Sequence, residues 1–203
     1  MIIKSIKQEV SDIYIVEKSK FIAFILPIVG EEMATNRLNE IKKQYQDATH
    51  VCYAFILNDN GVLKYKCSDD GEPASTAGQP ILNVLKMNNL ENVLAIVVRY
   101  FGGIKLGAGG LIRAYSNATN LALKKCEESI IKDCPNYKLT FPYNLINQID
   151  NYLKNLDVVI KDKKYEIEVE YILIFKNDDI DKLKNKFYDN LKIEYLYDTK
   201  EII

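Results

Sequence analysis

The chain has 203 residues, more than one typical domain and too few for three. Hydrophobic residues make up 48% and charged residues 27%, the balance of an ordinary globular protein and not of a disordered or fibrous one. Lysine and arginine total 27 against 28 aspartates and glutamates, so no global positive field drives nonspecific nucleic-acid binding, and any phosphate contact must come from a local patch.

Targeting signals and cysteine spacing indicate the cellular compartment of the protein and the state of its thiols. The amino-terminus lacks the long apolar run of a signal peptide, and no apolar segment reaches membrane-spanning length. These features predict a cytoplasmic protein with no membrane partner. No Cys-x-x-Cys pair occurs, so buried free thiols are a better interpretation than a disulfide or a zinc site. The cysteines are Cys52, Cys67, Cys126 and Cys134.

The first two thirds of the chain alternate between strand and helix patterns. Thr76 and Gln79 have the spacing of a capping box and predict the start of one helix. The apolar run at 92–98 is typical of a strand covered on both faces. The predicted elements are strands at 13–16 and 21–26, a helix at 31–46, a hairpin of strands 51–57 and 62–66 around loop 58–61, a helix at 77–87, the strand at 92–98 and a helix at 110–127.

The composition changes near Pro135, beyond which the chain has neither glycine nor arginine. We therefore expect two domains, residues 1–134 with an α/β fold and residues 135–203 with an α+β fold. The second domain is predicted to contain strand 137–142, helix 144–156, strands 158–162 and 165–175, helix 179–191 and strand 192–198. This βαββαβ order predicts a ferredoxin-like sandwich.

A glycine-rich loop lies between the apolar strand and the helix predicted at 110–127. Five of the nine glycines lie in it, and a glycine loop that leads into a helix N-terminus favours an anion. Its spacing matches neither the P-loop nor the dinucleotide-binding pattern. The alternative is a tight strand–helix connection that demands small residues. The candidate phosphate-binding residues are Arg99, Gly102, Gly103, Lys105, Gly107, Gly109, Gly110, Arg113 and Asn117.

An acidic segment precedes the helix predicted at 77–87. Its residues of interest are Ser68, Asp69, Asp70, Glu72 and Thr76. Carboxylates this crowded bind a partner or Mg²⁺, or pair with Arg99, Lys105 and Arg113. A catalytic interpretation uses Ser68 or Ser75 with His50, the chain's one histidine. The remaining interpretation is a loop braced by salt bridges and turn chemistry. We expect no catalytic residue, metal or cofactor, and keep His50 as a further polar candidate.

These two segments carry a family resemblance. The matching stretches are Ser68-Asp69-Asp70-Gly71-Glu72-Pro73, Thr76-Ala77-Gly78-Gln79-Pro80-Ile81-Leu82 and Arg99-Tyr100-Phe101-Gly102-Gly103-Ile104-Lys105-Leu106-Gly107. In order and spacing they closely resemble the YigZ/IMPACT family, over about residues 15–125. Small residues depart from the bacterial pattern at Ala74, Ser75, Ala108 and Ser116, and the charged positions are intact.

The resemblance implies a fold and a class of function. It implies a first domain like the second domain of a small-subunit ribosomal protein, and a second domain like the last, ferredoxin-like domain of elongation factor G. Eukaryotic IMPACT proteins regulate translation in the stress response through a protein partner. We therefore expect a noncatalytic regulator that binds RNA or the ribosome, not DNA, through the glycine-rich loop. The alternatives are docking of a translation-associated protein, or a small metal-dependent hydrolase of the dipeptidase kind.

Overall fold

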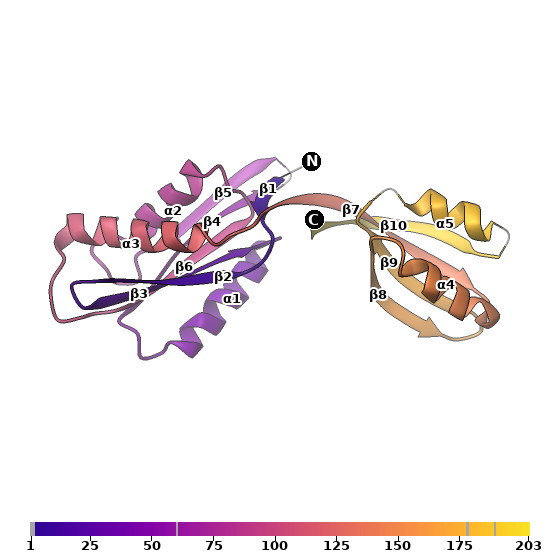
Figure 1. Cartoon of the computed structure of the whole chain (residues 1–203), viewed down its shortest axis with the longest axis horizontal. Helices are drawn as coiled ribbons and strands as arrows, with labels where there is room; N and C mark the ends of the chain where they lie inside the picture. Colours follow the sequence, from indigo (N-terminus) through magenta and orange to yellow (C-terminus); the bar gives the residue numbers. More distant parts are fainter. Residues whose placement is uncertain (1–2, 60, 178, 189) are drawn as a thin grey trace. The chain divides into compact units, whose positions relative to one another are not determined.

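A computed structural model describes residues 3–59, 61–177, 179–188 and 190–203 (Figure 1). The chain forms two compact units, the first ending at Ile131 and the second beginning at Lys132, apart from a few terminal residues. Strand β7 (Glu128–Phe141) runs from one unit into the other, and the boundary predicted at Pro135 lies within it. Asn60 of the predicted loop and position 189 of the predicted last helix lie outside the described residues.

The first unit is built on an antiparallel sheet of five strands. Their order is β2-β3-β6-β4-β5, so the apolar strand β6 is central. A further strand, β1 (Ile3–Ile6), pairs with the beginning of β7. The five strands are β2 (Val10–Val16), β3 (Ser19–Pro27), β4 (His50–Asp59), β5 (Val62–Ser68) and β6 (Val93–Tyr100). The hairpin predicted around loop 58–61 is confirmed by the pairing of β4 with β5.

Helices cover both faces of this sheet, as Figure 1 shows. The helices are α1 (Glu31–Gln44), α2 (Gly78–Met87) and α3 (Gly107–Leu123). Because side chains alternate along a strand, β6 sends Val93, Ala95 and Val97 into the core beneath α2 and α3. Its other apolar residues, among them Leu94 and Ile96, join the core beneath α1. The prediction of a strand covered on both faces is confirmed.

The start of α2 corrects the predicted capping box. Thr76 donates its hydroxyl to the Pro73 carbonyl at 2.6 Å, and no side chain of the N-cap residue, Ala77, caps the helix. The carboxylate of Asp69 instead accepts the N–H groups of Ala77 and Gly78. The Thr76–Gln79 spacing gave the wrong cap because the preceding loop folds back and places a charged acceptor, the Asp69 carboxylate, at the helix end.

The second unit has the predicted βαββαβ order. Its strand order is β10-β7-β9-β8, and the predicted ferredoxin-like fold is confirmed. After β7 come a 3-10 turn at Tyr143–Leu145, α4 (Ile146–Leu153), β8 (Val158–Tyr165), β9 (Val169–Phe175), α5 (Ile180–Phe187) and β10 (Lys192–Ile202). One core joins the two helices to the sheet and includes Leu139, Tyr171 and Leu183.

All four cysteines are free thiols, as predicted. Cys52 and Cys134 are buried, but Cys67 is exposed, which corrects the expectation of burial there. Cys67 is exposed because β5 is an edge strand. In the part of the chain that the structure describes, no helix has the length and apolar character needed to cross a membrane.

Candidate functional site

The acidic segment is turned into the protein, beginning with Asp69. Its carboxylate accepts backbone N–H groups from Ser75 at 2.8 Å, Ala77 at 3.0 Å and Gly78 at 2.8 Å. Burial by itself would raise the pKa of Asp69, but these N–H groups favour the charged form more strongly and lower the pKa below its ordinary 3.8. Asp69 is therefore the cap of α2 and closes the loop in front of it.

Removing the Asp69 charge should change the stability of the protein in a pH-dependent way. Because the folded pKa of Asp69 is lowered, its charge contributes stability that is complete above the ordinary pKa of 3.8 and is lost as pH falls through the folded value. We expect Asp69→Asn to be less stable than the wild type by about 1–2 kcal/mol at neutral pH. The difference should shrink below pH 3.8 in urea titrations. A difference that stays constant into acid would contradict the charged cap.

Asp70 joins the same loop to strand β4 and helix α1. Its carboxylate accepts the Val51 N–H at 2.7 Å and pairs with Lys42 at 2.8 Å. Its carbonyl lies 2.8 Å from Nδ1 of His50, and its N–H donates to the Ser68 hydroxyl oxygen at 3.2 Å. His50 is thus held by backbone and, among the described residues, does not form the pair with a serine that the catalytic interpretation requires.

Glu72 is the centre of a buried polar group that we call the Glu72 cluster: Cys52, Glu72, Arg99 and Tyr115. Arg99 Nη1 lies 2.5 Å from Glu72 Oε1, and the Tyr115 hydroxyl donates to the same oxygen at 2.7 Å. The Glu72 and Arg99 side chains are 3% and 7% exposed. Cys52 Sγ lies 3.3 Å from the Tyr115 hydroxyl. The cluster ties the loop to β4, β6 and α3.

Burial governs the ionisation of the cluster. It raises the pKa of Cys52 to about 12, and it also raises the pKa of the Tyr115 phenol. A thiol with so high a pKa carries almost no thiolate at neutral pH and is a poor nucleophile. Glu72, which also faces His50 Nε2 at 3.8 Å, is neutralised by Arg99. The chemistry of this cluster is therefore that of a structural brace.

Arg99 corrects one member of the predicted phosphate-binding set. Its guanidinium lies 5.4 Å from the Phe21 ring centroid and 5.5 Å from that of Phe101, in addition to its bond with Glu72. A guanidinium that is paired and enclosed in this way is not available to a phosphate. The predicted pairing of an arginine with the acidic segment is confirmed for Arg99 alone among the described residues, since Lys105 and Arg113 form no ion pair there.

Lys105 and Arg113 instead line a groove of about 530 Å³, which we call the α3 groove. Both side chains are exposed. Gly110 and Asn117 of the predicted set also line it, whereas Arg99 and the remaining loop glycines do not. The complete lining is Tyr14, Val16, Glu17, Ile104, Lys105, Leu106, Gly110, Arg113, Ala114 and Asn117.

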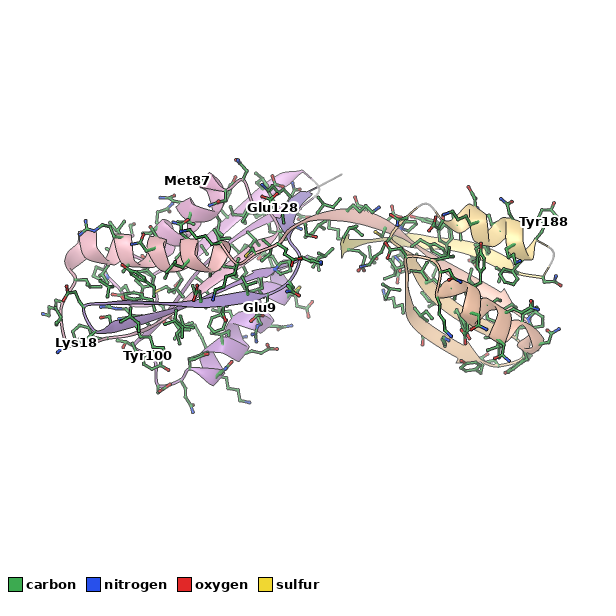
Figure 2. The ribbon with its side chains drawn as sticks, viewed as in Figure 1. Glu9, Lys18, Met87, Tyr100, Glu128 and Tyr188 are labelled. Carbon is green, nitrogen blue, oxygen red and sulfur yellow. The ribbon has the colours of Figure 1, made fainter. Side chains whose placement is uncertain are left out.

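Gly102 fixes the loop against the turn between β2 and β3. A Cβ at this position would lie 2.0 Å from the carbonyl carbon of Lys18, and the Gly102 N–H donates to Ser19 Oγ at 3.1 Å. Figure 2 labels Lys18 at this turn. Gly103 and Gly107 have φ values of 88° and 69°, which favour glycine. The close-packing interpretation therefore accounts for Gly102, and backbone conformation accounts for the other two.

The acidic segment does not fit a divalent cation. Its carboxylate oxygens accept N–H groups, a lysine, an arginine and a phenol, so few lone pairs remain for a metal. Across residues 3–59, 61–177, 179–188 and 190–203, no three His, Cys, Asp or Glu side chains are grouped as metal ligands. The metal-dependent alternative thus lacks a donor set in this segment.

Several residues of the site cannot be identified from local sequence patterns, because they approach it from distant segments of the chain. Tyr14, Val16 and Glu17 come from the β2–β3 hairpin and meet α3 in space only. Tyr115 packs its ring in the core beneath α2 and α3, while its hydroxyl donates to Glu72. The one available signal for Tyr115 is a polar atom at a buried position, because such atoms require a partner.

Comparisons with known proteins identify the family of the chain. Residues 17–123 match the family model "Impact N-terminal domain", a range that holds both the Glu72 cluster and the glycine-rich loop. The chain is 39% identical to IMPACT family member YvyE of Bacillus subtilis, covering 77% of this chain and 72% of the relative. It is 34% identical to IMPACT family member YigZ of Escherichia coli, covering 74% of each.

One solved structure extends the likeness to nearly the whole chain. A crystal structure described as a hypothetical protein matches with a TM-score of 0.64 and 28% identity, covering 95% of this chain and 96% of the other. Protein IMPACT of the mouse is 31% identical over 72% of this chain and 42% of its own length. Given the family model and these relatives, the chain belongs to the IMPACT family.

Proposed function

We propose that the protein is a noncatalytic regulator of translation that associates with RNA or the ribosome, and that the α3 groove contacts phosphate through Lys105 and Arg113. The observation that carries this proposal is that Lys105 and Arg113, which form no ion pair with any residue the structure describes, meet in one groove. The resemblance to IMPACT proteins, which implies translational regulation, supplies the biological setting.

The electrostatics of the α3 groove favour one anionic group. Lys105 and Arg113 are opposed by a single carboxylate, Glu17, so the lining keeps a net positive charge. Helix α3 spans 17 residues and begins beside the groove, and no side chain of its N-cap residue, Leu106, caps it. Its first N–H groups and its dipole add positive potential there. These features support phosphate as the ligand.

The other predicted functions receive less support. Docking through the acidic segment needs its carboxylates at the surface, but Asp69, Asp70 and Glu72 are engaged by groups of the protein itself. A hydrolase needs a free nucleophile or a metal, and the Glu72 cluster offers a neutral thiol and a neutralised carboxylate. The brace formed by this cluster instead supports a binding surface with fixed geometry.

The proposal is tested by co-sedimentation of the full chain with ribosomes and with ribosomal RNA at increasing salt. The groove variant is Lys105→Glu/Arg113→Glu. Its matched control is Lys43→Glu/Lys124→Glu, because these lysines are exposed, form no ion pair among the described residues and lie outside the groove. We expect the wild type and control to bind at low salt and the groove variant to bind at least about tenfold more weakly.

This pair of variants distinguishes the loss of cations at the groove from a general change in net charge. Both double variants change the net charge equally, so a general field would weaken both to a similar extent. Circular dichroism confirms that each variant is folded. Equal loss in the two variants, or wild-type binding that is indifferent to salt, would contradict phosphate contact at the groove. Retained protein-partner binding without any RNA binding would favour the docking alternative.

A further inference from the structure

The α3 groove combines its charged residues with an apolar wall. Beside its charged residues it is lined by Tyr14, Val16, Ile104, Leu106 and Ala114. Ile104 is 42% exposed although it is a large aliphatic side chain. A site that contacts only the backbone of a nucleic acid needs cationic side chains and amide groups but no apolar side chains. The apolar wall therefore calls for a ligand with an apolar face next to its phosphate.

Two members of this wall, Tyr14 and Leu106, are held by contacts within the protein. The Tyr14 ring lies 6.4 Å from that of Phe21, and its hydroxyl accepts a hydrogen bond from the Asn117 amide at 3.4 Å. Leu106 and Tyr14 both pack on the core beneath α2 and α3. A surface fixed in this way loses little conformational entropy on binding, which favours affinity.

We propose that the α3 groove binds one unpaired RNA nucleotide, with its phosphate at Lys105 and Arg113 and its base against Tyr14, Ile104 and Leu106. This inference rests on the proposed function, since it assumes that the groove contacts phosphate. In a duplex the faces of the bases are stacked inside the helix, so only an unpaired base can lie against an apolar wall. The groove volume of about 530 Å³ is within the range of small-ligand sites.

Glu17 limits the number of phosphates that a ligand of the groove can carry. Glu17 lines the groove, and a carboxylate there can accept hydrogen bonds but repels a second phosphate. The charges of the groove thus favour one phosphate with an uncharged group beside it. That is the composition of a nucleotide in a single strand, and it differs from a polyphosphate or from the paired phosphate rows of a duplex.

The experiment uses the full chain and fluorescence anisotropy with an unstructured single-stranded RNA and a duplex RNA of equal length. The test variant is Ile104→Ala and the matched control is Ile112→Ala. Ile112 is also 42% exposed but lies outside the groove. We expect the single strand to bind at least about tenfold more tightly than the duplex, and Ile104→Ala to weaken it about fivefold with Ile112→Ala within about twofold.

The outcomes distinguish this inference from the function on which it rests. If duplex and single strand bind equally, or if the two isoleucine variants behave alike, while Lys105→Glu/Arg113→Glu still abolishes binding, the groove contacts phosphate but not an unpaired base. In that case the inference is wrong and the proposed function stands. If neither RNA binds the wild type at low salt, the inference is wrong; if the wild type also fails to co-sediment with ribosomes and ribosomal RNA, the proposed function is wrong as well.

Discussion

Replacing Arg99 with alanine is expected to destabilise the first unit by about 3–5 kcal/mol, because it leaves the carboxylate of Glu72 buried without its counterion. Removing one member of a buried pair costs more than removing both, since a lone buried charge has neither water nor a partner. The measurement is hydrogen exchange of the β6 amides at increasing urea, which reports on the unit that contains the pair.

Two matched variants make this prediction specific. Arg37→Ala removes an arginine whose ion pairs are more exposed, at 26% for its own side chain, and should cost about 1 kcal/mol or less. Arg99→Met/Glu72→Gln removes both charges while keeping an acceptor for Tyr115, and should recover most of the loss. Equal effects of Arg99→Ala and Arg37→Ala would contradict a buried brace.

Replacing Gly102 with alanine is expected to cost about 3 kcal/mol or more, because the added Cβ would meet backbone and not a side chain that can turn away. The three nearest atoms are the carbonyl carbon and oxygen of Lys18 at 2.0 and 2.2 Å and the nitrogen of Ser19 at 2.3 Å. The loop must move away from the β2–β3 turn, and this shift should also displace Lys105 from the groove. Thermal unfolding and RNA binding measure the two effects.

Gly109→Ala is the control for this prediction. Gly109 lies in the first turns of α3, and an added Cβ would meet only Arg113 Nη1 at 3.6 Å. Alanine there should be neutral or stabilise by about 0.5–1 kcal/mol, since it restricts the unfolded chain. A Gly102→Ala variant as stable as Gly109→Ala would contradict the close approach of the loop to the hairpin.

Features encoded by neighbouring residues were predictable from the sequence. The unbroken apolar run of β6 signals burial on both faces, and the βαββαβ pattern signals the ferredoxin-like unit, because both follow from the periodicity of side chains along one segment. The dense charges of 68–72 and the glycines of 102–110 also draw attention to the Glu72 cluster and to the loop beside the α3 groove. These signals need no knowledge of which distant segments pair.

Roles decided by distant contacts were not predictable. The sequence allows Arg99 to pair with the acidic segment, but it does not single out Glu72 as the partner or separate Arg99 from Lys105 and Arg113. The capping-box spacing at Thr76 is likewise overridden by Asp69. The apolar wall of the groove is another example, since Tyr14 approaches α3 only through the pairing of β2 with β3 and of β3 with β6. Register between strands of high sequence separation supplies this information, and a single sequence does not contain it.

The salt dependence of binding to an unstructured RNA oligonucleotide tests the central claim most directly. Each cation that neutralises a phosphate releases counterions, which contributes a slope of about −0.7 to log K against log salt concentration for a single strand. We predict that Lys105→Ala/Arg113→Ala makes the slope shallower by about 1.4, and that Lys43→Ala/Lys124→Ala leaves it unchanged. An unchanged slope in the groove variant, or the same change in both variants, would contradict a phosphate-binding groove at α3.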